Sequence, residues 1–548
     1  MEGHLLNLIA KTLVEYIKPL EDANQGETKF SDPSSQTPEI ELLDQALEAL
    51  CKNIKDSTQK LQPVGVSQST EANVSSSQAS QTVQYPIVSL GEHKNEVVDL
   101  VLKRIKVSYD ILDLHSRLCL LSLSIFPENV VIKKRHTIYW WIGDGFVKNT
   151  KEKMAEEKGE EIFDELLNSY LIVPHDNGKC PIVNKFKINP WIRHMLVSLV
   201  PREINNQLFY SQIGSSHQYL PSHTCLVLDQ QKVKISDEFG LEYDNWRTVF
   251  NVGASYLNFG PQWMTKMKKL VVLQLGRWQA SPSHHIEVEN VEFLKGLKDQ
   301  KNLKYLSLRG ISRISELPPS IGQLVGLEIL DLKACHNLET LPNEIALLRT
   351  LTHLDVSQCY LLESMPKGIE KLNELQVLKG FVIGSSTKTP CRISDLAKLK
   401  NLKRLSIHIG SEAVIQEGDF ESLKDFITVK RLKISWGVNK DIHISLPSGL
   451  EKLDLEGYPS ETIPEWLKPS KLPSGLKKLY IKGGKLNVTD HGEKGRASGV
   501  KIVRIKYQNH LHMTSPNLKE LFPSLEYAEW NHFQWTFEEK GKTTTSKS

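Results

Sequence analysis

The sequence predicts an α/β protein in which N-terminal helices and a winged-helix domain precede a C-terminal solenoid with a parallel sheet on its concave face. Three observations support this prediction. A six-residue phrase, L-x-x-L-x-L, recurs through the C-terminal half of the chain. Apolar residues at helical spacing mark several segments before residue 200. Between these regions, helical segments are followed by a short hairpin pattern and another helix, which is the order of a winged-helix module.

The repeated phrase has a regular period. It starts at Leu303, Leu327, Leu351 and Leu375, so three successive intervals are 24 residues each. Periods of about 20–29 residues with this phrase are typical of leucine-rich repeats, and unrelated leucine-rich strands or helices would not explain the equal intervals. The end of each phrase predicts a short strand whose outer leucines point inward, where only a neighbouring repeat can bury them. Later copies start at Leu402, Val429, Leu450 and Leu476, and weaker copies start at Leu270, Val500 and Leu525.

Composition divides the chain into five segments. Residues 1–62 carry helical and heptad-like spacing, which fits either a helical pair or coiled coil, or a single helix against the rest of the protein. Residues 63–91 are rich in Ser, Gln and Thr and are predicted to be a disordered linker. Residues 92–205 are predicted to form the winged-helix domain, residues 206–540 the solenoid, and residues 541–548 a disordered tail.

Charge and cysteine usage narrow the class of protein. The formal net charge is +3 with both signs present, which by itself indicates neither a nucleic-acid partner nor a membrane surface. No apolar run approaches the roughly 20 residues of a membrane-spanning helix, and the first residues do not resemble a signal peptide. None of the 7 cysteines forms a C-x-x-C pair, and Cys335 and Cys359 each follow the last apolar strand residue by three positions. We therefore expect buried thiols in a reducing cytoplasm, with peripheral attachment to the plasma membrane left open.

Two groups of polar residues are interpreted as structural. The histidines at residues 284–285 and at 510 and 512 have no partner ligand at fixed spacing, so we interpret them as solvated loops and not as metal ligands. The paired acids at residues 156–157 and 160–161 predict a solvated helix face.

Three stretches resemble a known family. They are S-Y-D-I-L at residues 108–112, L-C-L-L-S-L-S-I-F-P-E-N at 118–129 and W-I-G-D-G-F-V at 141–147. They are similar to the winged-helix segment of plant nucleotide-binding leucine-rich-repeat disease-resistance proteins, and the repeat at 354–372 resembles the coiled-coil branch of that family. The resemblance implies that the repeats sense a ligand or guarded partner and that the N-terminal helices signal. It also implies protein partners such as other immune receptors or kinases.

The chain departs from this family at the nucleotide-binding residues. The phosphate-binding motif G-x-x-x-x-G-K-[ST] is absent from the sequence, and G-D-G at residues 143–145 is not a dinucleotide fingerprint. Ile188, Asn189 and Pro190 occupy the positions of the family's Met-His-Asp motif, whose histidine contacts the nucleotide. We therefore expect no cofactor, no metal and no catalytic residue, and a defence role as an adaptor, decoy or helper. The alternatives are an ADP/ATP-binding switch and a repeat scaffold outside immunity, such as a ubiquitination adaptor.

In each strand, the residue before the middle leucine, the residue between the last two leucines and the residue after the last leucine are predicted to face the concave surface and to bind a partner. From Arg404 onward this face carries eight positive and two negative residues on contiguous strands. We expect this basic half to bind an acidic protein surface, with electrostatic steering of association. The alternative is that the lysines only keep a parallel sheet soluble. The predicted partner-binding residues are Tyr305, Arg309, Phe381, Arg404, Arg431, Lys433, Lys452, Lys478, Tyr480, Lys482, Arg504 and Lys506.

Overall fold

The chain divides into two compact units that do not follow the linear domain order. The computed structural model describes residues 106–150, 152–175, 182–189, 192–193, 195–196, 209–212, 224–235, 246–278, 285–385, 391–486, 499–507, 515–531, 533–537 and 543–547. The predicted N-terminal helices and linker lie outside these residues. One unit comprises Met1–Val130, Glu161–Val173 and Lys187–Leu199, and the other comprises Val131–Glu160, Pro174–Phe186 and Val200–Ser548. The predicted winged-helix domain therefore contributes to both units.

The first unit contains α5 (Leu114–Ser122), its continuation η2 (Leu123–Ile125) and the C-terminal part of α7 (Ala155–Asn168). Asp113 is a favourable N-cap of α5 because its carboxylate accepts a 2.6 Å hydrogen bond from Ser116 N. The Ser116 hydroxyl donates to Glu165 of α7 at 2.6 Å. Cys119 is fully buried, as its apolar surroundings in the sequence predict.

The second unit begins with β1 (Ile132–Lys133), which pairs antiparallel with β3 (Lys185–Ile188) through Ile132 and Phe186. α6 (Lys134–Asp144) follows and ends at Gly145, whose φ of 83° is left-handed and suits glycine. Every residue of α6 from Thr137 to Asp144 is buried. A helix buried all round needs neighbours on every side, and α6 contacts strands of the repeat sheet.

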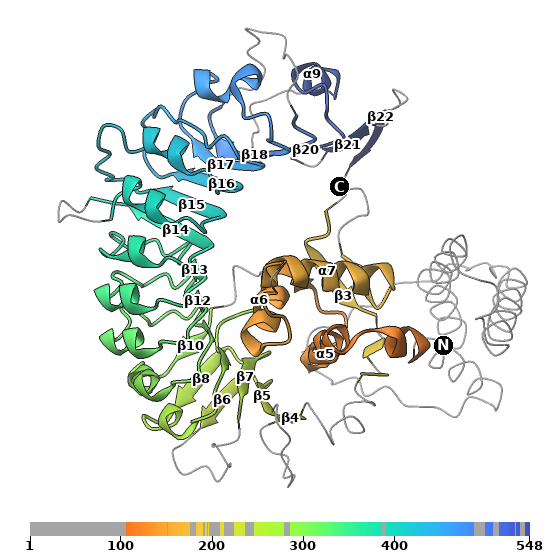
Figure 1. The fold of residues 1–548 in the computed structure, drawn as a ribbon, viewed down its shortest axis with the longest axis vertical. Coiled ribbons are helices and arrows are strands. Elements are labelled where there is room, and N and C mark those ends of the chain that lie inside the picture. The colour runs from red at the N-terminus through yellow and green to blue at the C-terminus, as the bar shows by residue number, and fades with distance from the viewer. Residues whose placement is uncertain are drawn as a thin grey trace, which may run out of the picture. The chain divides into compact units, whose positions relative to one another are not determined.

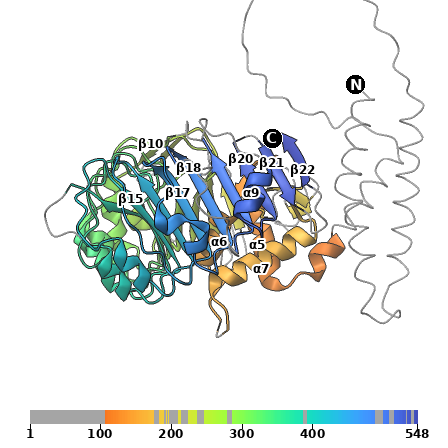
Figure 2. The same cartoon turned by 90° about the horizontal axis from the view of Figure 1, so that it is seen from above.

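The repeats form one long sheet in the second unit, and the strands stand side by side along an arc (Figure 1). The described strands run parallel from β4 to β20, and the last two pair antiparallel. Figure 2 shows β15 to β20 following one another along the sheet. In sheet order the strands are β4 (Phe209–Gln212), β5 (Thr224–Leu228), β7 (Thr248–Asn251), β9 (Val272–Gln274), β11 (Tyr305–Ser307), β12 (Ile329–Asp331), β13 (His353–Asp355), β14 (Val377–Ile383), β15 (Arg404–Ile409), β16 (Arg431–Trp436), β17 (Lys452–Tyr458), β18 (Lys478–Gly484), β19 (Ile502–Lys506), β20 (Tyr527–Trp530), β21 (Phe533–Phe537) and β22 (Thr543–Lys547).

The strand register confirms the repeat phrase. Leu306, Leu330, Leu354 and Leu378 pair in register on successive strands, and all four are fully buried. Burial of each leucine contributes roughly 1.5–3 kcal/mol, which becomes available only when the next repeat covers it. Cys335 and Cys359 are buried free thiols, as predicted. Their Sγ atoms donate to the carbonyl oxygens of the preceding repeats at 3.2 Å.

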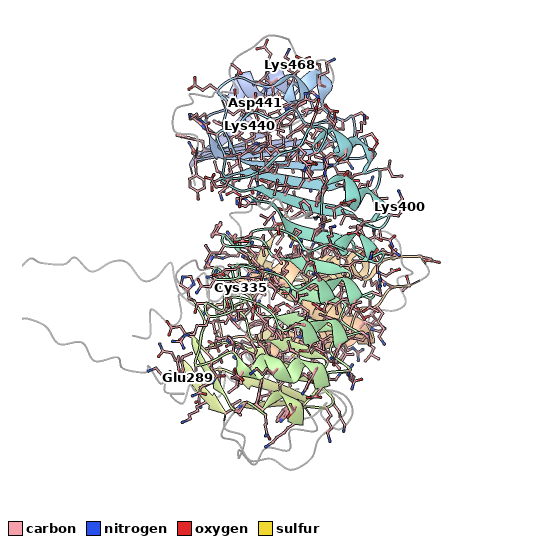
Figure 3. All side chains as sticks on the ribbon, turned by 90° about the vertical axis from the view of Figure 1, so that its left-hand side faces the viewer. Glu289, Cys335, Lys400, Lys440, Asp441 and Lys468 are labelled. Carbon is pink, nitrogen blue, oxygen red and sulfur yellow. The ribbon has the colours of Figure 1, made fainter. Side chains whose placement is uncertain are left out.

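Short helices line the outer side of the arc, opposite the strands (Figure 1). Figure 3 views this side, where Lys400 projects from the turn after η9. The 3₁₀ helices are η4 (Met264–Lys266), η5 (Glu292–Asp299), η6 (Pro319–Gln323), η7 (Asn343–Leu347), η8 (Ile369–Lys371), η9 (Ser394–Lys398), η10 (Glu421–Asp425), η11 (Glu465–Leu467) and η12 (Pro469–Lys471), followed by the α-helix α9 (Ser515–Leu521). Within the described residues, no helix has the length and apolar character needed to cross a bilayer.

Several strands carry no clear phrase and were not predicted. β5 and β7 extend the sheet upstream with Leu226 and Val249 as fully buried residues, so valine replaces the leucine that the phrase requires. A second sheet has the order β10-β8-β6, from β10 (Glu287–Val288), β8 (Tyr256–Phe259) and β6 (Lys232–Ile235). β2 (Ile172–Pro174) lies between α7 and β3 in sequence. The prediction of a disordered tail is wrong for Thr543–Lys547, because β22 pairs with β21 there.

Candidate binding surface on the concave face

The concave face carries a continuous row of side chains from the strand positions between the inward-pointing leucines. Strand pairing places these positions directly opposite one another across the sheet, so neighbouring side chains in the row are close enough to interact. In register the row reads Ser307, Asp331, Asp355, Lys379, Ser406, Lys433, Asp454, Tyr480, Arg504 and Glu529.

α6 covers the first part of this face, which corrects the prediction for Tyr305 and Arg309. Both side chains are only 4% exposed. The Tyr305 hydroxyl donates to Gln274 Oε1 at 2.8 Å, and a Cβ added at Gly143 would lie 2.5 Å from Tyr305 Cβ. Arg309 contacts the His136 ring through its Nη1. These residues hold the chain's own helix and are not available to a partner in this structure.

Asp144 ties the end of α6 to the sheet. Its carboxylate accepts hydrogen bonds from Trp140 Nε1 at 2.9 Å and from the Thr248 hydroxyl on β7 at 2.8 Å. Burial raises the pKa of Asp144 to about 6, although both hydrogen bonds act in the opposite direction. The G-D-G segment is therefore a packing element: Gly143 gives Tyr305 room, and Asp144 bonds to β7.

A buried ionic cluster joins α7 to β13 and β15. Arg404 pairs with Glu156 at 2.5 Å and donates to the Tyr139 hydroxyl at 3.2 Å, while His353 Nε2 lies 3.8 Å from Glu156. Burial opposes the charge on Glu156, but His353 and Arg404 outweigh it and hold the pKa of that carboxyl well below its usual value. The prediction of a solvated face is wrong for Glu156. The prediction agrees with the position of Glu157, which is exposed and whose carboxylate lies 3.0 Å from Lys403 Nζ at the surface.

Phe381 lies in the core, and its predicted place on the concave surface is wrong. Lys379 pairs with Ser406, but the register then shifts so that Phe381 pairs with Ile407, a buried position. Gly380 forms the bulge with a φ of 82°, and a Cβ added there would lie 2.5 Å from Ser357 N. One extra residue in the strand reverses the direction of the next side chain, so Phe381 is 1% exposed.

A cavity of about 410 Å³ opens on the concave face across β13 to β17. Four predicted partner residues lie in its wall: Arg404, Arg431, Lys433 and Lys452. Burial and neighbouring cations lower the pKa of Lys452 to about 8 and that of Arg431 to about 10. Its charged lining consists of Arg135, Lys333, Lys379, Arg404, Arg431, Lys433 and Lys452 with the acids Asp454 and Glu456.

The remaining predicted residues lie on β18 and β19, past the cavity. The Tyr480 ring stands between two cations, with Lys452 Nζ 3.9 Å and Arg504 Cζ 5.2 Å from its centroid. Lys482 is exposed, and Lys478, Tyr480, Arg504 and Lys506 are half-buried.

Carboxylates on neighbouring strands reduce the predicted excess of positive charge. Glu456 pairs with both Lys433 and Lys482 at 2.5 Å. Glu529 on β20 pairs with Arg504 at 3.1 Å and with Lys506 at 2.7 Å. Sequence reasoning missed Glu529. The signal was the weak repeat copy at Leu525, because Glu529 sits at the same position of that phrase as Arg504 in the preceding repeat.

The residues at the Met-His-Asp positions take structural roles where they are described. Ile188 ends β3 and is buried, and the Asn189 carbonyl accepts a 2.9 Å hydrogen bond from Arg193 N. Pro190 lies outside the described residues. Among the residues that the structure describes, no cluster of three or more His, Cys, Asp or Glu side chains is suited to a metal ion. His285 packs against His336 at 5.5 Å between ring centroids, and His284, His510 and His512 are not described.

The stacked strands, outer 3₁₀ helices and in-register leucines define a leucine-rich-repeat protein whose concave face is the candidate binding surface. Residues 249–540 match the family described as a leucine-rich repeat region, and residues 125–196 match the winged helix domain of disease resistance proteins. The chain therefore belongs to the leucine-rich-repeat family, and its winged-helix segment is similar to that of disease resistance proteins.

Named relatives are consistent with this assignment. Disease resistance RPP13-like protein 4 of Arabidopsis thaliana is 29% identical over 398 residues, which are 71% of this chain and 44% of that protein. Disease resistance protein PIK6-NP of Oryza sativa subsp. japonica is 27% identical over 44% of this chain and 22% of its own length. The chain thus spans less than half the length of these relatives. Among solved structures, a leucine-rich-repeat protein of Leptospira interrogans aligns with a TM-score of 0.36 and 17% identity, covering 56% of this chain and 84% of that one.

Proposed function

We propose that this chain recognises a protein partner in plant defence through the β18–β19 surface, which we define as Lys478, Tyr480, Lys482, Arg504 and Lys506. The observation that carries the proposal is the position of Tyr480 between two cations on a part of the concave face with exposed and half-buried side chains. Aromatic and arginine residues contribute strongly to protein interfaces. The lysines favour an acidic partner surface.

The covered part of the face supports the same assignment. Tyr305, Arg309 and Arg404 are engaged with α6 and α7 within the second unit. A partner that approaches the concave side would therefore meet the strands beyond the cavity. The partner is a protein of the host or of a pathogen, and the chain acts as a cytoplasmic receptor or adaptor and not as an enzyme.

The test compares charge reversal on two sides of the solenoid. Partners are captured from infected and healthy plant tissue with the full chain, with Lys478→Glu/Lys482→Glu/Lys506→Glu, and with the control Lys268→Glu/Lys400→Glu/Lys424→Glu. The control makes the same charge change at exposed residues outside the concave row. We expect an infection-dependent partner to be lost only with the first variant. Equal capture by both variants would contradict the proposal.

We also propose that the chain works without a nucleotide switch. The 548-residue sequence contains no G-x-x-x-x-G-K-[ST]. Asn189 stands at the position of the family's nucleotide-contacting histidine, and its backbone carbonyl accepts a hydrogen bond from Arg193 N. Isothermal titration of the full chain with ADP should give no heat of binding at micromolar concentrations. Saturable micromolar binding of ADP that tripolyphosphate does not displace would favour the alternative of an ADP/ATP-binding receptor.

A further inference from the structure

We propose that the cavity across β13 to β17 binds a compact small molecule carrying several phosphate groups. This site goes beyond the protein-recognition role and uses different residues from the β18–β19 surface, so either proposal can fail without the other. The cavity volume of about 410 Å³ lies within the range of small-molecule pockets, roughly 300–1,000 Å³.

The cavity has more positive charge than its own carboxylates balance. Lys379 pairs with Asp355 at 2.8 Å, and Lys433 pairs with Glu456 at 2.5 Å. For Arg135, Lys333 and Arg431, the described part of the chain offers no carboxylate oxygen within 4.0 Å. The buried Nε of Arg135 also has no hydrogen-bond acceptor among the described residues. A bound anion would supply both the missing charge and the missing acceptor.

The cations of the cavity wall are grouped closely, and two of them have carboxylate partners: Arg404 pairs with Glu156 at 2.5 Å, and Lys452 lies 3.6 Å from Asp454. Arg404, Arg431 and Lys452 occupy the first residues of three adjacent strands, which span about 10 Å at a strand spacing of about 4.8 Å. Arg135 reaches the same cavity wall from α6. Their proximity is also evident in the lowered pKa values of Arg431 and Lys452, to which burial contributes most and Arg135 adds repulsion.

This geometry favours phosphates over an acidic peptide. Guanidinium groups bind phosphate oxygens through two parallel hydrogen bonds, and two arginines here are without a carboxylate partner. An extended peptide places carboxylates on one face only every second residue, about 7 Å apart, with one charge each. Linked phosphates bring more charge into the same volume. Because the site is at the floor of a concave face, we assign it to a free molecule and not to a lipid headgroup.

The experiment uses isothermal titration of the full chain with sodium tripolyphosphate. We compare the wild type with Arg135→Gln/Arg431→Gln and with the control Lys400→Gln/Lys424→Gln, which removes the same charge on the outer side. We expect saturable binding by the wild type and the control, and binding at least tenfold weaker in the cavity variant. No saturable binding by the wild type, or equal affinity in all three proteins, would overturn the proposal.

Two further arms separate the competing ligands and control for folding. A decamer of glutamate that binds more tightly than tripolyphosphate would overturn the assignment in favour of an acidic peptide. Vesicles with phosphorylated inositol lipids that bind when tripolyphosphate does not would overturn it in favour of a membrane surface. The unliganded cavity variant should have an unchanged or higher Tm, since it removes mutually repelling cations. Tripolyphosphate should raise the Tm of the wild type and of the control only.

Discussion

Arg404, the first residue of β15, forms a 2.5 Å ion pair with Glu156 in the first turn of α7. Both side chains are largely buried, with 12% and 13% of their surface exposed. The pair explains why Arg404, which the sequence predicts to bind a partner, instead contacts α7 of its own chain.

Removal of one member of this pair should destabilise the fold. Glu156→Gln leaves Arg404 buried without its counter-ion, and loss of one partner of a buried pair costs about 3–5 kcal/mol. Urea unfolding should show this decrease, and Glu156→Gln/Arg404→Gln should recover part of it. A loss below about 1 kcal/mol in the single variant would show that the pair is solvated and not structural.

The buried carboxyl of Asp144 should make stability depend on pH in the direction opposite to most acids. Burial raises its pKa from 3.8 to about 6, so between these values the folded protein holds a proton that the unfolded chain has released. The free energy of unfolding should therefore fall as pH rises through this range, by about 2–3 kcal/mol. Unfolding is measured from pH 4 to pH 7 for the wild type and Asp144→Asn. The free energy of unfolding of the wild type minus that of Asp144→Asn should decrease as pH rises, and an increase would contradict the assignment.

The bulge at Gly380 should be sensitive to a single methyl group. Gly380→Ala places a Cβ 2.5 Å from Ser357 N at a φ of 82°, whereas Gly418→Ala meets a φ of 80° with no atom within 4 Å. Both variants bear the conformational cost, about 1 kcal/mol, and only the first adds a steric clash. We expect Gly380→Ala to be the less stable by a further 1–3 kcal/mol, roughly, in chemical unfolding. Equal stabilities would mean that β14 accommodates the methyl group by moving.

The sequence predicts the repeat architecture well because each leucine phrase is a local signal that recurs. β11 to β18 follow directly from it, as does the burial of Cys335. It is harder to predict which side chains of the concave face are exposed, because their burial depends on contacts with residues far away in the sequence. Arg404 and the Tyr139 hydroxyl are 265 residues apart in sequence, and no local pattern indicates their contact. The prediction for Phe381 is wrong for another reason: the bulge at Gly380 reverses the alternation of inward- and outward-pointing side chains along β14.

The ring of Tyr480 should matter more to recognition than its hydroxyl. Tyr480→Ala removes the surface on which Lys452 and Arg504 pack, while Tyr480→Phe retains it. We expect the alanine variant to bind the defence partner about tenfold more weakly and the phenylalanine variant to bind nearly as the wild type. Surface plasmon resonance with the captured partner measures both. Similar losses in the two variants would assign the contribution to the hydroxyl.

Site-specific photo-crosslinking in plant tissue tests the central claim most directly. A photoreactive phenylalanine analogue replaces Tyr480 on the concave face or, as a control, the exposed Val325 in the turn before β12. The account predicts an infection-dependent covalent adduct from position 480 and none from position 325. Adducts from position 325 alone would contradict recognition through the β18–β19 surface.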